Sequence, residues 1–422
     1  MQFPLHFIVT VILLLFFLSH LFTRYLSLFI VRRPRSKSSH QSVLHLNAYD
    51  EFRITIFSDL HYGEEEDGWG IDQDLRSSRV MNDVLDIERP DFVVLIDGDL
   101  ITGENTFLSN STKYLDVIVR PLVDRNLSWA STYGNHDSQF NLSRRALFAE
   151  EEKYEGSYTR AEVAGGEGVT NYYLLIYPPS RRGKGDGDED SPAAILWFFD
   201  SQGGAHFQGV EEYIPNFVPA SVVSWFTSTS SHLAARFNKT IPSLAFVHIP
   251  PSAFLALQET VFPERGDESA VFPGLNDDVP LAAQGQGQGE GRDVGFMQAL
   301  IDTPGLHSVY SGHDHGDAWC ANWPADVTGV VREEGVEGPK LCFGKHSGYG
   351  GYGRWRRGAR CLSLSFQKGS GESGGYGEME VETWVRMEGG EVVNLVKLNR
   401  TYGRDLYAVE DGEEVGDSRI TI

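Results

Sequence analysis

Five short apolar segments of this chain each end in a cluster of aspartate, asparagine and histidine side chains. The segments and their clusters are residues 52–57 before Asp59 and His61, 91–96 before Asp99, 129–133 before Asn135 and His136, 244–248 ending at His248, and 308–311 before His313 and His315. Helical patterns at residues 75–85 and 115–123 separate the first three segments. Strands that alternate with helices predict a layered α/β fold whose strands are largely parallel.

The five clusters are expected to meet in space, because the carboxyl ends of the strands in an open α/β sheet converge on one crevice. A single histidine at any of these positions is more often a structural residue, so the conjunction is the informative signal. Acidic and imidazole groups buried without basic partners are costly, and divalent cations are the simplest way to stabilise them. Histidine with carboxylate oxygen suits zinc, iron or manganese better than magnesium or calcium. Seven ligands are too many for one ion and suit two ions that share a bridging carboxylate.

The motif series resembles that of the calcineurin-like metallophosphoesterases. It consists of D-x-H at 59–61, GD at 98–99, GNHD at 134–137, His248 close to a proline, and GHDH at 312–315, and it covers about residues 52–315. The words GHDHG and KHSGYGGYG (345–353) resemble a single-domain branch related to purple acid phosphatases, with a yeast cell cycle regulator phosphatase and short plant proteins among its members. This resemblance implies a four-layer αββα sandwich.

The resemblance also implies the role of each motif residue. Asp59, His61 and His315 would hold one metal ion, Asn135, His248 and His313 a second, and Asp99 would bridge the two. His136 would face the substrate and act in catalysis. The ions would be two divalent or trivalent transition metals (Fe, Zn or Mn). Residues 100–105 contain no tyrosine to follow Asp99, so the ferric tyrosinate site of purple acid phosphatases is not expected.

The implied function is hydrolysis of phosphate monoesters by a hydroxide that the two metals activate. The substrate would be a small molecule or a phosphoprotein. Two alternatives stay open: a phosphodiesterase acting on nucleotides or lipid head groups, and a non-catalytic scaffold with the same fold. A formal net charge of −23 argues against nucleic acid as a partner, because phosphate backbones are bound by clustered lysine and arginine. The oligomeric state is left open.

The ends of the chain differ in composition from its centre. Residues 1–35 contain a nearly continuous apolar run and predict a membrane anchor or signal segment, followed by a polar linker at 36–50. The catalytic domain is expected at 51–410, with flexible insertions near 178–192, 284–292 and 369–377, and an acidic tail at 411–422.

Two signals give opposite orientations for such an anchor. The basic residues that follow the run (Arg32, Arg33, Arg35 and Lys37) favour a cytosolic domain. Five N-glycosylation sequons, at Asn110, Asn126, Asn141, Asn238 and Asn399, favour the lumen. We expect a lumenal domain in the secretory pathway or at the vacuolar membrane, or a secreted protein, with the cytosolic orientation left open.

Several residues keep two interpretations. Cys320, Cys342 and Cys361 fit either three buried apolar side chains or one disulfide with a free thiol. The loop at 345–353 is either a phosphate-approaching segment or a glycine-rich turn before a strand at 360–366. Asp314 and Asp317 are suggested to orient the imidazoles, and Asp137 is expected to be a hydrogen-bonded turn residue.

Overall fold

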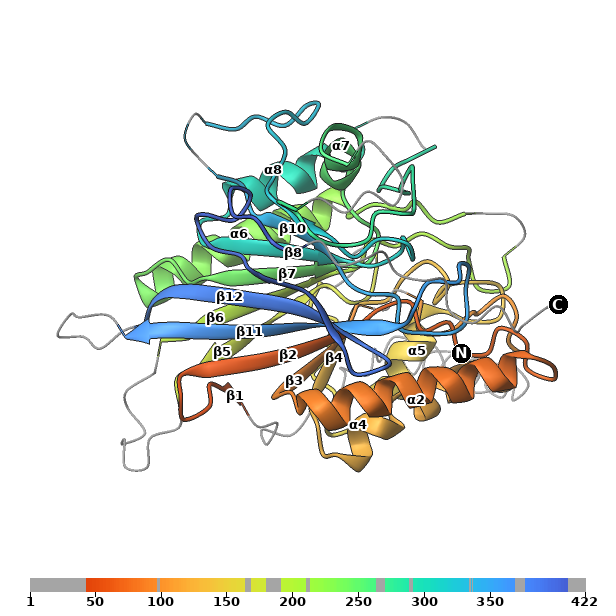
Figure 1. The fold of residues 1–422 in the computed structure, drawn as a ribbon. Helices are drawn as coiled ribbons and strands as arrows, with labels where there is room; N and C mark the ends of the chain where they lie inside the picture. The colour runs from red at the N-terminus through yellow and green to blue at the C-terminus, as the bar shows by residue number, and fades with distance from the viewer. Residues whose placement is uncertain are drawn as a thin grey trace, which may run out of the picture. The chain divides into compact units, whose positions relative to one another are not determined.

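Two β-sheets form the centre of the domain. The computed structural model describes residues 43–96, 99–163, 168–179, 191–209, 213–262, 270–287, 291–333, 335, 337–368 and 376–408. The first sheet has the order β1 (Leu44–His45), β5 (Tyr172–Tyr177), β6 (Ala194–Phe199), β7 (Ser243–Val247), β8 (Leu306–Ser311), β10 (Lys340–Phe343) and β9 (Cys320–Ala321). The second has the order β13 (Val392–Lys397), β12 (Tyr376–Met387), β11 (Gly358–Lys368), β2 (Glu51–Phe57), β3 (Phe92–Leu95) and β4 (Trp129–Ser131) (Figure 1).

Both faces of the central strands are buried, because successive side chains of a strand point to opposite faces. In β3, Phe92 and Val94 join the core between the two sheets, whereas Val93 and Leu95 pack toward the helices. In β6, Phe198 joins the core between the sheets and Trp197 packs toward the helices. This double burial explains why these segments are apolar throughout rather than alternating with polar residues.

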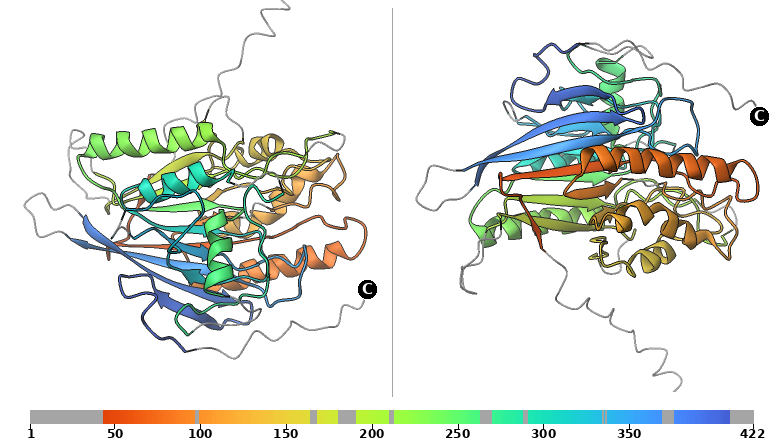
Figure 2. Two further views of the ribbon diagram at one scale, coloured as in Figure 1. Left: turned by 90° about the horizontal axis from the view of Figure 1, so that it is seen from above. Right: turned by 60° about the horizontal axis from the view of Figure 1, so that its bottom comes forward.

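The helices cover the outer face of each sheet. Those next to the seven-stranded sheet are α6 (Ala220–Phe237), α7 (Ser252–Thr260) and α8 (Val294–Asp302). Those next to the six-stranded sheet are α2 (Gly70–Glu88), α3 (Tyr114–Ile118), α4 (Arg120–Asp124) and α5 (Arg144–Glu151), with a 3-10 turn at Ser111–Lys113. Figure 2 shows α6 and α2 on opposite outer sides of the paired sheets. The four-layer α/β sandwich is therefore confirmed.

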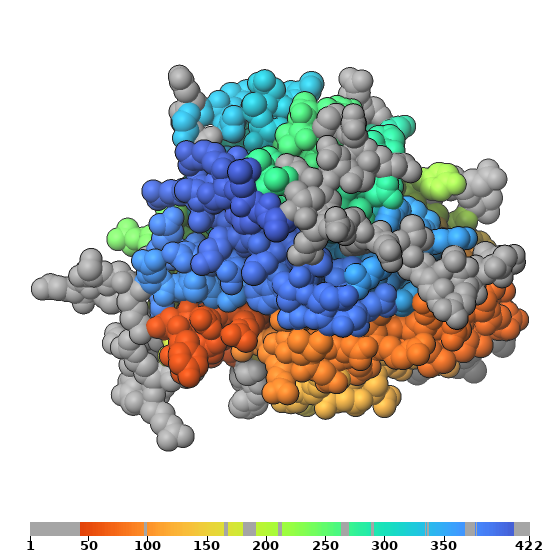
Figure 3. Space-filling model, in the orientation of Figure 1, coloured from red at the N-terminus to blue at the C-terminus, as the bar shows by residue number. Residues whose placement is uncertain are grey.

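The expectation of largely parallel strands holds for only part of the sheets. β2, β3 and β4 are parallel to one another, as are β6, β7, β8 and β10. β11, β12 and β13 instead form an antiparallel ribbon against β2. Figure 3 shows this C-terminal ribbon and α2 at the surface, where Glu88 of α2 accepts hydrogen bonds from Trp384 and Arg386 of β12.

The helix expected at 115–123 is two short helices, α3 and α4. The second helix, α4, begins at Arg120 and has Pro121 in its first turn. A proline lacks the N–H group that would continue the hydrogen-bond ladder of α3, and its ring would clash with the carbonyl group four residues earlier. The periodicity was therefore right about helical residues and wrong about a single helix.

The structure also bears on the expected linker, anchor, tail, insertions and cysteines. Leu44 and His45 of the expected linker form β1, and the expected anchor, the tail at 411–422 and most of the insertions lie outside the described residues. Gln284, in the second insertion, is buried and donates from its side chain to Ile249 O.

Cys320 and Cys342 form a disulfide between β9 and β10, and Cys361 is a buried free thiol. Within the described ranges, none of the helices has both the length and the hydropathy of a membrane span.

Candidate metal centre

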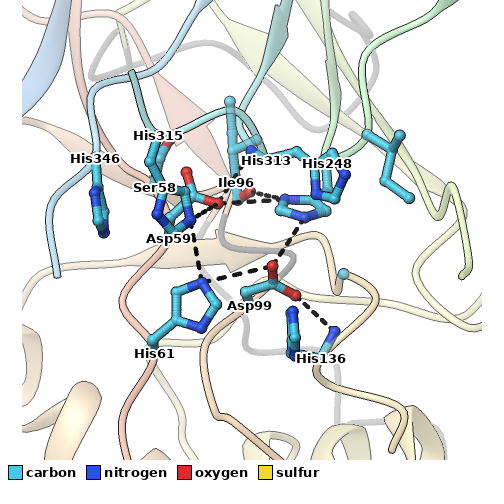
Figure 4. Close-up of polar contacts among 12 residues, drawn as sticks. Ser58, Asp59, His61, Ile96, Asp99, His136, His248, His313, His315 and His346 are labelled. Atoms are coloured by element: carbon cyan, nitrogen blue, oxygen red, sulfur yellow. Dashed lines mark hydrogen bonds and ion pairs between the residues drawn. The ribbon is translucent and has the colours of Figure 1, made fainter. Parts of the chain in front are cut away.

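The polar clusters lie together at the carboxyl ends of five strands, as the strand-end argument predicted. We call this side of the sheets the metal edge, and define it by the loops that follow β2, β3, β4, β7 and β8. Figure 4 shows the side chains of Asp59, His61, Asp99, His248 and His315 pointing toward one another. Residues that are up to 256 positions apart in the sequence thus share one small volume.

One group consists of Asp59, His61 and His315, whose ligand atoms lie within 4.8 Å of one another. The Nε2 atoms of His61 and His315 are 3.2 Å apart, and the Nε2 atom of His315 is 3.8 Å from Oδ1 of Asp59. Two imidazole nitrogens that each bind an ion at about 2.1 Å have a separation of this size. The spacing therefore fits a shared cation.

The second group consists of Asp99, His248 and His313, again within 4.8 Å. Oδ2 of Asp99 lies 3.3 Å from Nε2 of His248 and 3.7 Å from Nε2 of His61, so this one oxygen faces both groups. A carboxylate between two ligand groups has the position that a bridging ligand needs.

Burial shifts the pKa values of these groups toward their neutral forms. Desolvation raises the pKa of Asp59 to about 7, and it lowers the pKa values of His61 and His313 to about 3. Burial also disfavours the charged form of Asp99, but the neighbouring charges of His136 and His248 outweigh it and hold the pKa of Asp99 well below its ordinary value. Burial also disfavours the charged form of His248, but the neighbouring Asp99 carboxylate outweighs it and raises the pKa of His248. The neutral imidazoles of His61 and His313 and the ionised carboxylate of Asp99 are the forms that bind transition metals.

Two further observations fit metal ions at these groups. Oδ1 of Asn135 is buried and has no hydrogen-bond partner among the described residues. Nε2 of His248 is buried too, and it faces Oδ2 of Asp99 at 3.3 Å without a well-formed hydrogen bond. Asp59, His61 and His313 have φ angles of 56°, 48° and 77°, in the left-handed region that residues other than glycine rarely occupy. Such strain is typical of functional sites, where the surrounding structure holds a side chain in one direction.

Asn135 and His136 lie beside the second group. The backbone N–H of His136 donates to Oδ1 of Asp99 at 2.7 Å. Gly203 packs between Asn135 and Ile249, the residue after His248. A Cβ atom added to Gly203 would lie 3.0 Å from the Asn135 side chain and 3.2 Å from the Ile249 side chain. Both Asn135 and His136 are half-buried, which places them between the buried groups and the solvent.

His136 donates from Nδ1 to a carboxylate oxygen of Glu104 at 2.6 Å. The two side chains are 31% and 35% exposed, unlike the fully buried Asp59, Asp99 and His248, so this pair lies between the buried groups and the solvent. Burial alone would lower the pKa of His136, but the charges of Asp99 and Glu104 raise it to about 10. The histidine therefore holds a proton near neutral pH. Glu104 was missed by the sequence analysis.

The imidazoles are oriented by groups that the sequence analysis did not identify. Nδ1 of His315 donates to Tyr352 O at 2.8 Å, and the Tyr352 ring stacks on the imidazole at a centroid distance of 4.0 Å. Nδ1 of His248 donates to Ile96 O at 3.3 Å, and Nδ1 of His61 pairs with the Thr102 hydroxyl at 3.2 Å. In each ring the hydrogen bond uses Nδ1 and leaves Nε2 available for a metal.

Among the described residues, Asp314 and Asp317 form no hydrogen bond with an imidazole, and their partners contradict the suggestion that they orient the rings. Asp314 accepts from Ala282 N, and Asp317 accepts from Gln258 Nε2 and Asp278 N. These carboxylates connect the 312–317 loop to α7 and to the segment before α8. Asp137 is the expected turn residue, since it accepts from the backbone N–H groups of residues 100, 101 and 134 and so joins two loops of the metal edge.

The loop at 345–353 packs directly on the first group. The His346 ring packs against the His315 ring at a centroid distance of 3.8 Å and a tilt of 37°, and Gly351 N donates to Glu64 at 3.0 Å. A Cβ atom on Gly351 would lie 2.5 Å from Cε1 of His315 and 2.8 Å from Cδ2 of His61. Glycine is thus required at position 351 by the close approach of the loop to the two imidazoles.

Substituting Gly351 by alanine is expected to weaken metal binding by about tenfold to a hundredfold, because both imidazoles must move and φ is +71°. Competition with a chromogenic chelator measures the affinity. Gly295→Ala is the matched control, since Gly295 has open space around its Cα in α8. Equal metal affinity in the two variants would show that the loop does not constrain the ligands.

Comparison with known proteins gives the family. The family model described as calcineurin-like phosphoesterase matches residues 52–317, which include every candidate ligand described above. The chain belongs to the calcineurin-like phosphoesterase family. The resemblance inferred from the motifs is thereby confirmed.

Relatives of this phosphoesterase include plant and yeast proteins. Two Arabidopsis thaliana proteins, named probable inactive purple acid phosphatases 14 and 29, are each 24% identical, over 82% and 84% of this chain and 82% and 87% of their own length. The Saccharomyces cerevisiae protein named phosphatase DCR2 is 25% identical over 64% of this chain and 45% of its own length. The relatives thus carry names that differ on activity.

Proposed function

We propose that this protein is a metal-dependent phosphatase that hydrolyses phosphate monoesters at a dinuclear site. The observation that carries the proposal is the shared position of Asp99 between two buried groups, each of which has further imidazole or carboxylate ligands. Asp59, His61 and His315 would hold one ion, Asn135, His248 and His313 the other, and Asp99 both. Histidine and carboxylate ligands fit iron, zinc or manganese.

Two bound cations would polarise the phosphoryl oxygens and lower the pKa of a water molecule that attacks phosphorus. The protein supplies the other parts of the reaction. Asp99 fixes the spacing of the two ligand groups and, through its contact with His136 N, the position of the catalytic histidine. His136 is the proton donor to the leaving-group oxygen, and Glu104 holds its ring by the bond to Nδ1.

A non-catalytic scaffold is the second candidate, because two plant relatives carry names that include the word inactive. Loss of activity usually follows loss of ligands. Here the candidate ligands and His136 are present at the metal edge, which favours the enzyme.

Turnover and metal content of the same preparation decide between the candidates. The purified protein is depleted with a chelator, loaded with iron, zinc or manganese, and assayed with p-nitrophenyl phosphate and with its bis-ester. We expect turnover of the monoester that disappears on chelation and returns on loading. A protein that binds two equivalents of metal and turns over neither substrate would be a scaffold, and preference for the bis-ester would make it a phosphodiesterase.

Glu104→Gln is expected to lower kcat about tenfold to a hundredfold with little change in metal content, because a charge-assisted hydrogen bond to His136 becomes a neutral one. Steady-state kinetics with metal analysis test this. Glu65→Gln is the control, since Glu65 is exposed in the neighbouring loop. Unchanged kcat in the Glu104 variant would remove Glu104 from the proposed mechanism.

We also propose that the catalytic domain lies in the lumen of the secretory pathway, as the sequons favour. The Cys320–Cys342 disulfide supports this location, because disulfides persist in oxidising compartments and are rare in the cytosol. The apolar run within residues 1–35 would direct the chain there and tether it to the membrane.

A further inference from the structure

The five N-glycosylation sequons fall into two structural groups. Asn126, Asn238 and Asn399 are exposed, whereas Asn110 and Asn141 are half-buried. We propose that the protein carries N-linked glycans at Asn126, Asn238 and Asn399 and at neither of the other two sequons. The proposal rests on the lumenal location proposed above and is independent of catalysis.

The three exposed sequons lie at the far edge of the sheets, which we define as the end of the parallel strands opposite the metal edge. Asn126 lies between α4 and the start of β4, and Asn238 ends α6 before the start of β7. Asn399 follows the end of β13. Lys397 of β13 pairs with Glu382 of β12, which pairs with Ser363 of β11. Ser363 in turn pairs with Arg53 near the start of β2, so the end of β13 lies beside the start of β2. Strand direction therefore places these three away from the candidate metal ligands.

The side-chain nitrogens of the exposed group are available for modification. Asn126 and Asn238 occupy left-handed turns, with φ angles of 53° and 49°. Asn399 uses only its Oδ1 atom, which accepts from the N–H groups of Thr401 and Tyr402 and from the Thr401 hydroxyl. Among the described residues, Nδ2 of these three asparagines donates to no other group. A sugar on Nδ2 would extend into solvent without breaking a contact.

Asn110 and Asn141 are held within the loops of the metal edge. Nδ2 of Asn141 donates to Thr106 O at 2.6 Å, and the backbone carbonyl of Asn141 accepts from the Ser111 hydroxyl at 2.9 Å. Oδ1 of Asn110 is buried. The two hydrogen bonds of Asn141 join the loop after Asp99 to the loop after Asn135. A sugar on Nδ2 of Asn141 would occupy the place of the Thr106 backbone, so the folded protein excludes it.

The result is an enzyme with glycans at one edge and an open site at the other. Carbohydrate at the far edge would cover surface without restricting the approach of a substrate to His136 and Glu104. Removing the glycans from the folded protein is therefore expected to leave turnover of p-nitrophenyl phosphate unchanged.

Site mapping on the full chain from a eukaryotic host tests the proposal. The protein is treated with peptide N-glycosidase in ¹⁸O-water, and peptides are analysed by mass spectrometry for aspartate that carries the label. We expect label at residues 126, 238 and 399 and unmodified asparagine at 110 and 141. Glycan at Asn110 or Asn141, or no glycan at any sequon, would overturn the proposal.

A matched pair of variants tests the assignment of Asn238 independently of folding. Thr240→Ala removes the sequon of Asn238 without altering the asparagine that ends α6, and it is expected to lose one glycan. Thr240→Ser keeps the sequon and is expected to retain it. Equal electrophoretic mobility of these two variants would contradict the assignment of Asn238.

Thiol labelling of the same sample separates this proposal from the one on location. Alkylation before and after reduction shows whether Cys320 and Cys342 are oxidised. Free thiols and no glycan would overturn both proposals. An intact disulfide and no glycan would overturn the glycan map and leave the oxidising location in place.

Discussion

Replacing Asp99 by asparagine is expected to lower kcat/KM for a phosphate monoester by about a thousandfold, a loss of about 4 kcal/mol of transition-state stabilisation. The amide keeps the shape of the side chain and can still accept from His136 N through one oxygen. It removes the negative charge that lies 3.3 Å from His248 and 3.7 Å from His61. Both ligand groups lose their common carboxylate, so metal content is expected to fall with activity.

Kinetics and metal analysis on one preparation measure both effects. Asp83→Asn is the control, because Asp83 is exposed on α2 and its variant is expected to match the unmodified protein. If the Asp99 variant retained two metal equivalents and full turnover, the carboxylate would not be a bridging ligand.

His136→Ala is expected to lower kcat about a hundredfold to ten-thousandfold while sparing the metals. His136 contacts Asp99 through its backbone N–H, which alanine keeps. Its ring donates a hydrogen bond to Glu104 and lies edge-on to the ring of His61 at a centroid distance of 5.2 Å. The variant therefore loses a proton donor without losing a ligand.

The leaving group distinguishes this role from a structural one. An alkyl phosphate needs protonation of its leaving oxygen, whereas p-nitrophenolate leaves without it. The loss in kcat is therefore expected to be larger for an alkyl phosphate than for p-nitrophenyl phosphate. His232→Ala, at an exposed position on α6, is the control. A loss of the same size for both substrates would contradict proton donation by His136.

The two variants together separate ligand binding from proton transfer. Asp99→Asn should lower metal content and turnover together, and His136→Ala should lower turnover alone. If both variants lost metal, His136 would belong to the ligand set.

Many strands and helices could be predicted from the sequence, because the pattern of apolar residues that specifies each of them lies within a short segment. A run such as residues 92–95 is apolar at each position, and a strand with two buried faces accounts for that run. The antiparallel ribbon of β11, β12 and β13 was not predicted, because its pairing with β2 joins Leu362 to Ile54 across more than 300 residues of sequence. At Pro121 a single local residue made the prediction wrong. The apolar residues keep a helical spacing through 115–123, but the proline divides the segment into α3 and α4.

The sequence by itself determined which side chains the metal edge would contain. Asp59, Asp99, His248 and His315 each follow an apolar strand, and the rule that parallel strands end at one edge brings them together. It also determined the positions of the sequons and the presence of three cysteines. Each of these properties depends on residue type and on short spacing.

Only the tertiary structure decided how the side chains are held. Thr102 orients His61, Tyr352 stacks on His315, and Glu104 holds His136. These contacts join loops that are distant in sequence, and no local pattern records them. The same holds for the pairing of Cys320 with Cys342 and for the exposure of Asn399, because burial and distance arise only when the layers pack.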